Sequence, residues 1–334
     1  MKFQPNIKNE GSVKLDLKDK KILQALSTNA RIPISQLAKR VGLSRDAIAH
    51  RIAQYEHQGL IQGYKTLINI KNFGYNNYHL FLQLNKPSQA TEQEVLKKLQ
   101  ASPHIRAILS YNGKYDLELA ITATTPEHFE TILEEILHQC GSYLLDYEIL
   151  IITKSYRAGA FPNSFLKQEG IPTKKIATPF TLDKKDHHIL QTLANNARIS
   201  FSALASQTDL SADAIRYRLN KLEDSQTIIG YRPAFNYDLL GYHVYAILAH
   251  LQSFNQHQEQ KLKQLLLQDP HVLWAVKTLG SYNLLMYIAA HNPHAVHETI
   301  HNLRQTFPAM IQRYEFLLAE EEHKYTYYPE TLLE

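Results

Sequence analysis

Cysteine is almost absent from this 334-residue chain, which contains only Cys140. One cysteine cannot form a disulfide within the chain or supply a thiolate metal cluster, so burial alone must hold the fold. No run approaches the roughly 18 apolar residues of a membrane helix, and the start lacks the apolar core of a secretory signal. We therefore expect a cytoplasmic protein that does not contact a membrane.

Motifs of the common catalytic sites are also missing. The sequence has no phosphate-binding glycine loop, no nucleophile elbow and no paired metal-ligand motif. We therefore predict a protein that is not an enzyme and has no catalytic residue, cofactor or metal. The net charge of +4 permits a nucleic acid partner but does not by itself argue for one.

What the sequence does contain is an internal repeat. Leu15 to Tyr75 aligns without a gap with Leu182 to Tyr242, an offset of 167 residues, with 28 identities in 61 positions. The chain is therefore two copies of one unit, called copy one and copy two below. We expect a linker at 154–181 between them, which carries prolines and lysines and reads as a solvated tether or as a basic segment that follows DNA. Non-periodic tails are expected at 1–14 and 321–334.

Each copy begins with three helical segments. In copy one, Asp16 and Asp19 mark the start of the first helix, and Ser44 is a natural N-cap for the third. A short second helix and a turn at Gly42 separate them, which is a helix-turn-helix arrangement. Copy two has Asp209 in place of Gly42, and an Asp tolerates such a turn. These domains are expected at 15–64 and 182–231.

The rest of each copy alternates short β-rich runs with helical ones. In copy one the expected strands are 64–70, 78–84, 105–111, 116–123 and 143–152, with helices at 92–100 and 127–139. After the linking strand, the order β, α, β, β, α, β predicts a ferredoxin-like domain at 65–153 and, by the repeat, another at 232–320. The fold class is therefore α+β, with two tandem copies of a winged helix-turn-helix followed by a ferredoxin-like domain.

These runs carry a family resemblance. Residues 34–75 and 201–242 resemble the DNA-binding domain of the leucine-responsive and asparagine-regulator (Lrp/AsnC) transcription factors, and residues 102–121 and 269–288 resemble the effector-sensing domain of that family. The resemblance implies a regulator that binds double-stranded DNA and a small-molecule effector such as an amino acid. Ordinary members carry one unit per chain and pair through their sensing domains, so this chain resembles two fused protomers, with further homo-oligomerisation expected through the sensing domains.

Candidate DNA contacts lie on and around the third helix of each copy. They are Ser44, Arg45, Asp46, His50 and Arg51 in copy one, and Ser211, Arg216, Tyr217, Arg218 and Lys221 in copy two. For Arg51 and Arg218 an ion pair within the helical bundle is the alternative to a phosphate contact. The copy-one domain carries a net charge of +4 and the copy-two domain of zero, so copy one should dominate attraction to DNA, and copy two could serve assembly instead. Because the two helices differ, we expect an imperfectly palindromic operator.

Candidate effector contacts follow from the same resemblance. They are Gly113, Tyr115 and Asp116 in copy one, and Gly280, Tyr282 and Asn283 in copy two. An Asp could receive an ammonium group and Asn283 cannot supply that charge, so the two sites should be unequal. The alternative is that these residues only form and pack a hairpin turn.

Two other functions stay open. The siroheme decarboxylases are similar to this chain in architecture. Tyr282, Asn283 and Leu284 are similar to a run of residues in those enzymes, and His104 and His271 are further candidate site residues for that function. His294, His297 and His301 have a spacing that could bind a metal, but copy one has Glu127, Glu130 and Glu134 there, which favours a solvated helix face. Trp274 is expected in the core.

Overall fold

The computed structural model describes residues 13–85, 89–166, 181–253, 255–308, 310–326, 328 and 331. Two compact units are present, and each contains parts of both copies. The head unit includes Val13–Tyr75 and Gln168–Asn236, and the barrel unit includes Asn76–Lys167 and Tyr237–Tyr325. Most of the expected tail at 1–14 and much of the expected linker lie outside the described residues. Within the described residues, none of the helices is long and apolar enough to span a bilayer.

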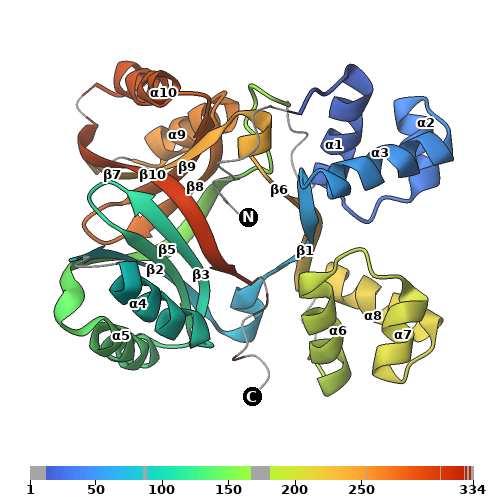
Figure 1. Cartoon of the computed structure of the whole chain (residues 1–334). Coiled ribbons are helices and arrows are strands. Elements are labelled where there is room, and N and C mark those ends of the chain that lie inside the picture. Colours follow the sequence, from blue (N-terminus) through green and yellow to red (C-terminus); the bar gives the residue numbers. More distant parts are fainter. Residues whose placement is uncertain are drawn as a thin grey trace. The chain divides into compact units, whose positions relative to one another are not determined.

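Three helices from each copy form the two heads of the head unit (Figure 1). They are α1 (Leu17–Thr28), α2 (Ile34–Val41) and α3 (Arg45–His57) in copy one, and α6 (Lys184–Asn195), α7 (Phe201–Thr208) and α8 (Ala212–Asp224) in copy two. Asp16 and Asp19 form the expected capping box of α1, and Asp183 and Asp186 form that of α6. The helix starts that the sequence predicted are thus confirmed in both heads.

The turns that end α2 and α7 differ in sequence but not in conformation. Gly42 and Asp209 both have left-handed backbone angles, with φ of 72° and 51°. Gln226, which follows α8, has a φ of 56° where copy one has Gly59. Within the described residues, Asp209 and Gln226 are the non-glycine residues with positive φ. Copy two therefore retains the turns of copy one at positions where it has lost glycine.

The strand that follows each head pairs with the strand from the other copy. β1 (Ile61–Ile68) runs antiparallel to β6 (Ile228–Phe235), with Lys65 opposite its repeat equivalent Arg232. The two heads therefore share one two-stranded ribbon as their wing, related by a pseudo-two-fold axis at this pair. The division at Tyr75 and Asn236 places these strands in the head unit, beyond the expected ends of the winged domains at 64 and 231.

The barrel unit closes a single barrel from the strands of both copies (Figure 1), in the order β10-β3-β4-β2-β5-β8-β9-β7. Copy one contributes β2 (Asn76–Leu84), β3 (Ile105–Asn112), β4 (Leu117–Ala123) and β5 (Leu144–Ala158). Copy two contributes β7 (His243–Leu251), β8 (Val272–Leu279), β9 (Leu284–Ala290) and β10 (Ile311–Tyr325). Each set of four has the strand order of a ferredoxin-like sheet, so the predicted α+β fold class is confirmed.

Helices cover the outer face of each sheet. They are α4 (Gln89–Ala101) and α5 (Pro126–Cys140) in copy one, and α9 (Gln256–Gln268) and α10 (Pro293–Thr306) in copy two. Alternate strand residues such as Leu80 and Leu119 pack beneath the helices of copy one, and Ile247 and Met286 beneath those of copy two. The intervening residues, such as His79 and Glu118, face the barrel interior.

Two expected boundaries move. β5 continues to Ala158, past the expected start of the linker at 154, because Arg157 is buried and donates hydrogen bonds to the carbonyls that end α9. β10 continues to Tyr325, past the expected start of the tail at 321, because this segment pairs with β3 and Lys324 caps the end of α4. Arg157 and Lys324 are repeat equivalents, so each copy closes a helix of the other.

Candidate nucleic-acid interface

The third helix of each head is anchored by one apolar face. Ile48, Ile52 and Tyr55 of α3 are buried, and so are Ile215, Leu219 and Leu222 of α8. The hydroxyl oxygens of Ser44 and Ser211 accept the amide hydrogens of Ala47 and Ala214 at 3.1 Å. These two candidate DNA contacts therefore act as N-caps that fix where α3 and α8 begin.

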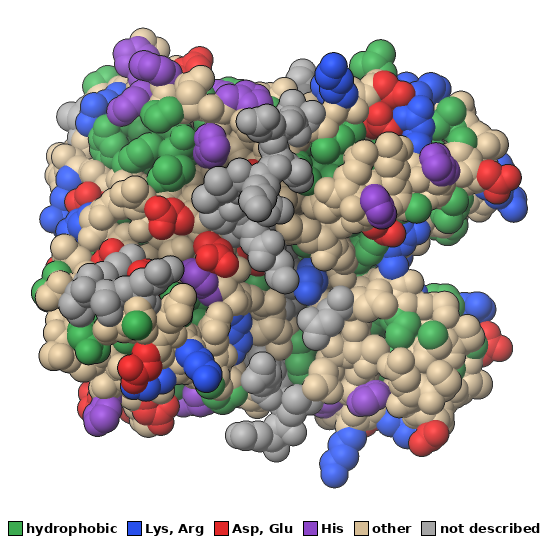
Figure 2. Space-filling view, viewed as in Figure 1, with side chains coloured by type: hydrophobic (Ala, Val, Ile, Leu, Met, Phe, Trp, Pro, Cys, Tyr) green, Lys and Arg blue, Asp and Glu red, His purple; other side chains and the backbone are tan. Residues whose placement is uncertain are grey.

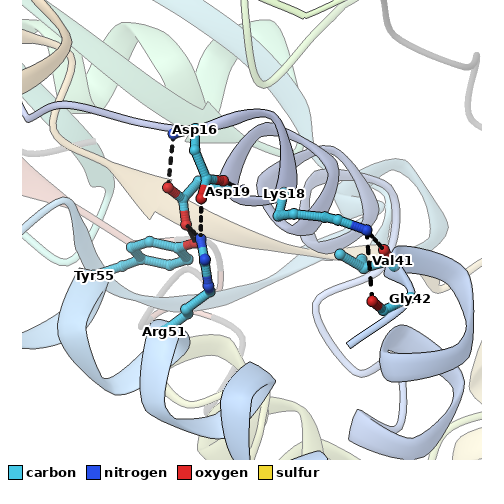
Figure 3. Close-up of polar contacts among 7 residues, drawn as sticks. All are labelled: Asp16, Lys18, Asp19, Val41, Gly42, Arg51 and Tyr55. Atoms are coloured by element: carbon cyan, nitrogen blue, oxygen red, sulfur yellow. Dashed lines mark hydrogen bonds and ion pairs between the residues drawn. The ribbon is translucent and has the colours of Figure 1, made fainter. Parts of the chain in front are cut away.

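Arg51 does not point away from its head but joins α3 to α1 (Figure 3). Its guanidinium lies 2.9 Å from the Asp16 carboxylate and also bonds to Asp19, which accepts the hydroxyl hydrogen of Tyr55 at 2.5 Å. The backbone amide of Asp19 and then Arg51 lower the pKa of Asp16. The structure thus has the ion pair that the sequence left as the alternative to a phosphate contact.

Arg218 makes the same connection in the second head. It lies 2.7 Å from Asp186, whose side chain is 1% exposed, and 2.8 Å from Asp183. The carboxylates of Asp186 and Asp183 raise the pKa of Arg218. Burial opposes ionisation of Asp183, but the Asp186 amide and Arg218 outweigh it and lower the pKa of Asp183. Both arginines therefore hold the third helix on the first.

The exposed face of α3 carries Arg45, Asp46 and His50. Arg45 and Ser44 line a shallow hollow between α2 and α3, together with Lys39 from α2. Figure 2 shows Lys and Arg side chains beside acidic ones on this head rather than one continuous basic surface. The face can therefore combine attraction for phosphate at the N-terminus of α3 with side chains able to reach bases.

The exposed face of α8 has different chemistry. Tyr217 is 61% exposed, and the Lys221 ammonium lies 4.7 Å from the centre of its ring. Arg216 pairs with Asp213 at 3.3 Å and lies over the Phe201 ring. The exposed candidates of the two heads are thus placed on corresponding surfaces that present different groups, which agrees with the unequal charge of the two sequences.

Two arginines that were not among the sequence candidates join the two heads. Arg31 donates to the carbonyl oxygen of Ala197 at 2.6 Å and lies over the Tyr231 ring. Its repeat equivalent Arg198 donates to the hydroxyl of Tyr64 at 3.2 Å and lies over that ring. The shared run Asn-Ala-Arg-Ile in both copies was the available signal, because it keeps the same arginine in two heads whose third helices differ at several exposed positions.

The candidate effector residues Asp116 and Asn283 have one structural role in common. Asp116 Oδ2 accepts the amide hydrogen of Leu84 at 2.6 Å, and Asn283 Oδ1 accepts that of Leu251 at 2.7 Å. The Asn283 amide also donates to the Leu251 carbonyl oxygen at 2.8 Å. Each side chain therefore closes the end of a strand in its own sheet, so an acid is not required at this position.

The remaining effector candidates pack between the copies. A Cβ at Gly113 would come within 2.6 Å of Leu317 on β10, and one at Gly280 would collide with the backbone of β5. Tyr115 and Tyr282 are both buried. Burial, followed by nearby carboxylates, raises the pKa of each phenol to about 12, so both stay protonated. These residues form the hairpin packing that the sequence left as the alternative to effector contacts.

Trp274, His297 and His301 have local partners. Trp274 stacks inside the barrel on His79 and Tyr287, with centroid distances of 5.8 and 5.0 Å. His301 lies 2.8 Å from the Gln305 amide nitrogen, and His297 stacks on Phe316. Among the described residues, no group of three or more potential metal ligands is arranged to hold an ion.

Comparison with known proteins gives a domain match in each head and longer matches that have about the length of one copy. The model of the AsnC-type helix-turn-helix domain matches residues 15–56 and 182–223. The transcriptional regulator LrpA of Pyrococcus horikoshii is 31% identical over 119 residues, which cover 36% of this chain and 83% of that protein. The proline dehydrogenase transcriptional activator of Rhodobacter capsulatus is 29% identical over 124 residues, covering 37% and 80%.

Comparison of structures matches most of the chain to the structure of an enzyme. The siroheme decarboxylase NirDL covers 92% of this chain and 92% of its own, with a TM-score of 0.63 and 13% sequence identity. The prediction that this chain is not an enzyme was therefore wrong. The same tandem architecture is that of an enzyme, and the absence of familiar catalytic motifs did not exclude it.

Proposed function

Because the chain belongs to the Lrp/AsnC family of transcriptional regulators, we propose that it binds specific double-stranded DNA sites through α3 and α8 together. The observation that carries this proposal is the arrangement of these helices. Their apolar faces and the Arg51 and Arg218 ion pairs hold them on the heads, while Arg45, His50, Arg216 and Tyr217 stay exposed. The shared β1–β6 ribbon joins the heads, so one chain presents two recognition helices.

The two helices read different sequences in this proposal. Arg45 and His50 contact the first half-site, and Arg216, Tyr217 and Lys221 contact the second. Arginine can bond two acceptors on guanine, whereas a tyrosine ring offers stacking and apolar contact. The operator is therefore an imperfect palindrome, and the head of copy one provides more of the phosphate attraction because of its net charge of +4.

The direct test is retention of labelled fragments of the source genome against excess unrelated DNA over a salt series. A few fragments should be retained, with affinity falling steeply as salt rises. Arg45→Ala and Arg216→Ala should each weaken specific binding by about 5 to 150-fold, from about 1 to 3 kcal/mol per guanine contact. Lys97→Ala, an exposed charge removed from the barrel unit, is the matched control and should leave affinity unchanged. Equal loss in all three variants would contradict the proposal.

A small-molecule effector and further assembly complete the proposed regulator. An amino acid or related effector binds the barrel unit and changes operator affinity. Leu145, Tyr147 and Leu279 are exposed apolar side chains of that unit, which supports homo-oligomerisation through the ferredoxin-like domains. Operator binding measured with each amino acid in turn tests the effector, and light scattering with Leu145→Ser and Leu279→Ser tests the assembly surface.

A second candidate function is tetrapyrrole chemistry of the siroheme decarboxylase type, favoured by the architecture shared over 92% of both chains. The residues weigh against it. Tyr282 and Leu284 are buried, and Asn283 bonds to the backbone of Leu251, so this run supports the hairpin of copy two. His271 lies 3.8 Å from the Glu298 carboxylate. Titration with an iron uroporphyrin separates the candidates: a saturable absorbance change with no operator preference would favour the enzyme.

A further inference from the structure

The backbone contacts that join the two halves of the barrel do not distinguish one copy from the other. The β5–β8 pairing ends with Ala158 opposite Trp274, and the β10–β3 pairing ends with Tyr325 opposite Ala107. Every registered pair in one set is reproduced in the other after a shift of 167 residues, and the two irregular steps in each set coincide. A copy could therefore pair with a like copy from another chain through the same hydrogen bonds.

Side-chain size does distinguish the copies at the ends of these strands. In both end pairs a large aromatic residue lies opposite an alanine, with Trp274 and Tyr325 from copy two and Ala158 and Ala107 from copy one. Two copies one would set alanine against alanine, and two copies two would set Trp274 against Tyr325. Ala107 is buried whereas Ala158 is exposed, so a pairing of two copies one is costly mainly because the buried alanine loses the aromatic side chain opposite it.

A buried hydrogen-bond network also distinguishes copy one from copy two. The Glu118 carboxylate of copy one, which is fully buried, accepts the hydroxyl hydrogens of Tyr111 and of Tyr287 from copy two at 2.5 Å, and also contacts His79. Burial raises the pKa of both tyrosines well above its usual value and keeps them as donors. Trp274 packs on His79 and Tyr287 and so encloses the network.

Like copies cannot form this network. The repeat equivalent of Tyr287 is Ala120, so two copies one would bury two Glu118 carboxylates that each lack this donor. The equivalent of Glu118 is Leu285, so two copies two would bury Tyr287 hydroxyls against leucine. A buried carboxylate or hydroxyl without its partner is costly, whereas the observed pairing satisfies both.

We propose that the two barrel halves have diverged into a complementary pair whose side chains select copy one as the partner of copy two and exclude pairing of like copies between chains. Specificity comes from the bond between the buried Glu118 and Tyr287 and from the pair of the buried Ala107 with Tyr325. The duplicated backbone supplies affinity, and these side chains supply partner choice. The linker then raises the local concentration of copy two around copy one, and the side chains already favour this pairing.

Exchange of two residues tests this selection in the full chain. In the native pairing, Glu118→Leu with Leu285→Glu removes the carboxylate that accepts from Tyr287, whereas two copies two now supply both this carboxylate and Tyr287 and become complementary. We expect this double variant to associate between chains, doubling its mass by light scattering relative to the parent at equal concentration. Adding Ala120→Tyr and Tyr287→Ala restores a donor opposite the moved carboxylate within one chain and should return the parental mass. A double variant with parental mass and stability, or a quadruple variant that does not recover, would overturn the proposal.

A cross-linking measurement reads partner choice without relying on mass. Ser155 and Val276 are opposite each other in the native register. Cysteines at both positions, joined by a short thiol cross-linker, should give a single-chain product, identified by the two joined peptides after proteolysis, in the parental background and lose that product in the double variant. If the double variant fails to fold, recovery of both folding and the single-chain product in the quadruple variant decides the matter, and absence of that recovery rejects the proposal.

Discussion

The guanidinium of Arg218 on α8 lies 2.7 Å from the carboxylate of Asp186 on α6. Asp186 is almost fully buried, so removal of the arginine leaves a buried charge with fewer partners. Arg216, two residues earlier, is exposed and pairs with the exposed Asp213 on its own helix. The two arginines of one helix therefore have separable roles in stability and in recognition.

Arg218→Ala should lower the stability of the head unit by about 2 to 4 kcal/mol, whereas Arg216→Ala should change it by less than about 0.5 kcal/mol. Urea unfolding followed by circular dichroism measures both. Operator affinity should show the reverse order when it is measured well below the unfolding midpoint. Equal stability of the two variants would show that the α8–α6 pair contributes little.

The pH dependence of the heads follows from the lowered pKa values of Asp16 and Asp183. A carboxyl whose pKa is lower in the folded state stabilises that state above its unfolded value of 3.8, and the contribution is lost as pH falls through the folded value. We therefore expect the urea midpoint of the head unit to fall below about pH 4. Asp16→Asn with Asp183→Asn keeps both N-caps and should flatten this fall. Asp46→Asn, at an exposed acid of α3, should leave it unchanged.

The order of elements was predictable because each one has a local cause. Asp16 and Ser44 cap helices through bonds to their own backbone, and strand periodicity follows from alternating burial. The 167-residue repeat then transferred each prediction to the second copy. Pairing of β1 with β6 was not predictable in this way, because it depends on residues far apart in the sequence and on the contacts of Arg31 and Arg198.

The candidate sites were harder to predict because residue type does not reveal the partner. Arg51 has the charge that a phosphate contact needs, but an acid on α1 lies close enough to bind it. Asp116 has the charge that an ammonium needs, but the Leu84 amide takes its oxygen. Arg45 and Tyr217 were correctly placed on exposed helix faces, since the apolar face of each helix fixes which residues remain outside.

Gln226 occupies a left-handed conformation that costs a residue with a Cβ about 1 to 2 kcal/mol. Gln226→Gly should therefore stabilise the head unit by roughly 0.5 to 1 kcal/mol, even though its side chain bonds to the Glu223 carbonyl oxygen. The matched change in copy one is Gly59→Ala at a φ of 75°, which should destabilise by a similar amount. Chemical unfolding of both variants measures the difference, and a loss of stability in Gln226→Gly would contradict the strain argument.

The similar hydrogen bonds of Asp116 and Asn283 predict how an exchange of carboxylate and amide changes the stability of the barrel unit. Because Asn283 bonds to the Leu251 amide as Asp116 does to that of Leu84, Asp116→Asn should alter the stability of the barrel unit by less than about 0.5 kcal/mol. Asp116→Ala leaves the Leu84 amide without this acceptor and should cost about 1 to 2 kcal/mol, and Asn283→Ala should cost the same. Thermal unfolding of the four single variants, with Asn283→Asp as the reciprocal exchange, makes the comparison. If Asp116→Asn were as damaging as Asp116→Ala, the carboxylate charge itself would be required, and the reading of this residue as an effector contact would regain its support.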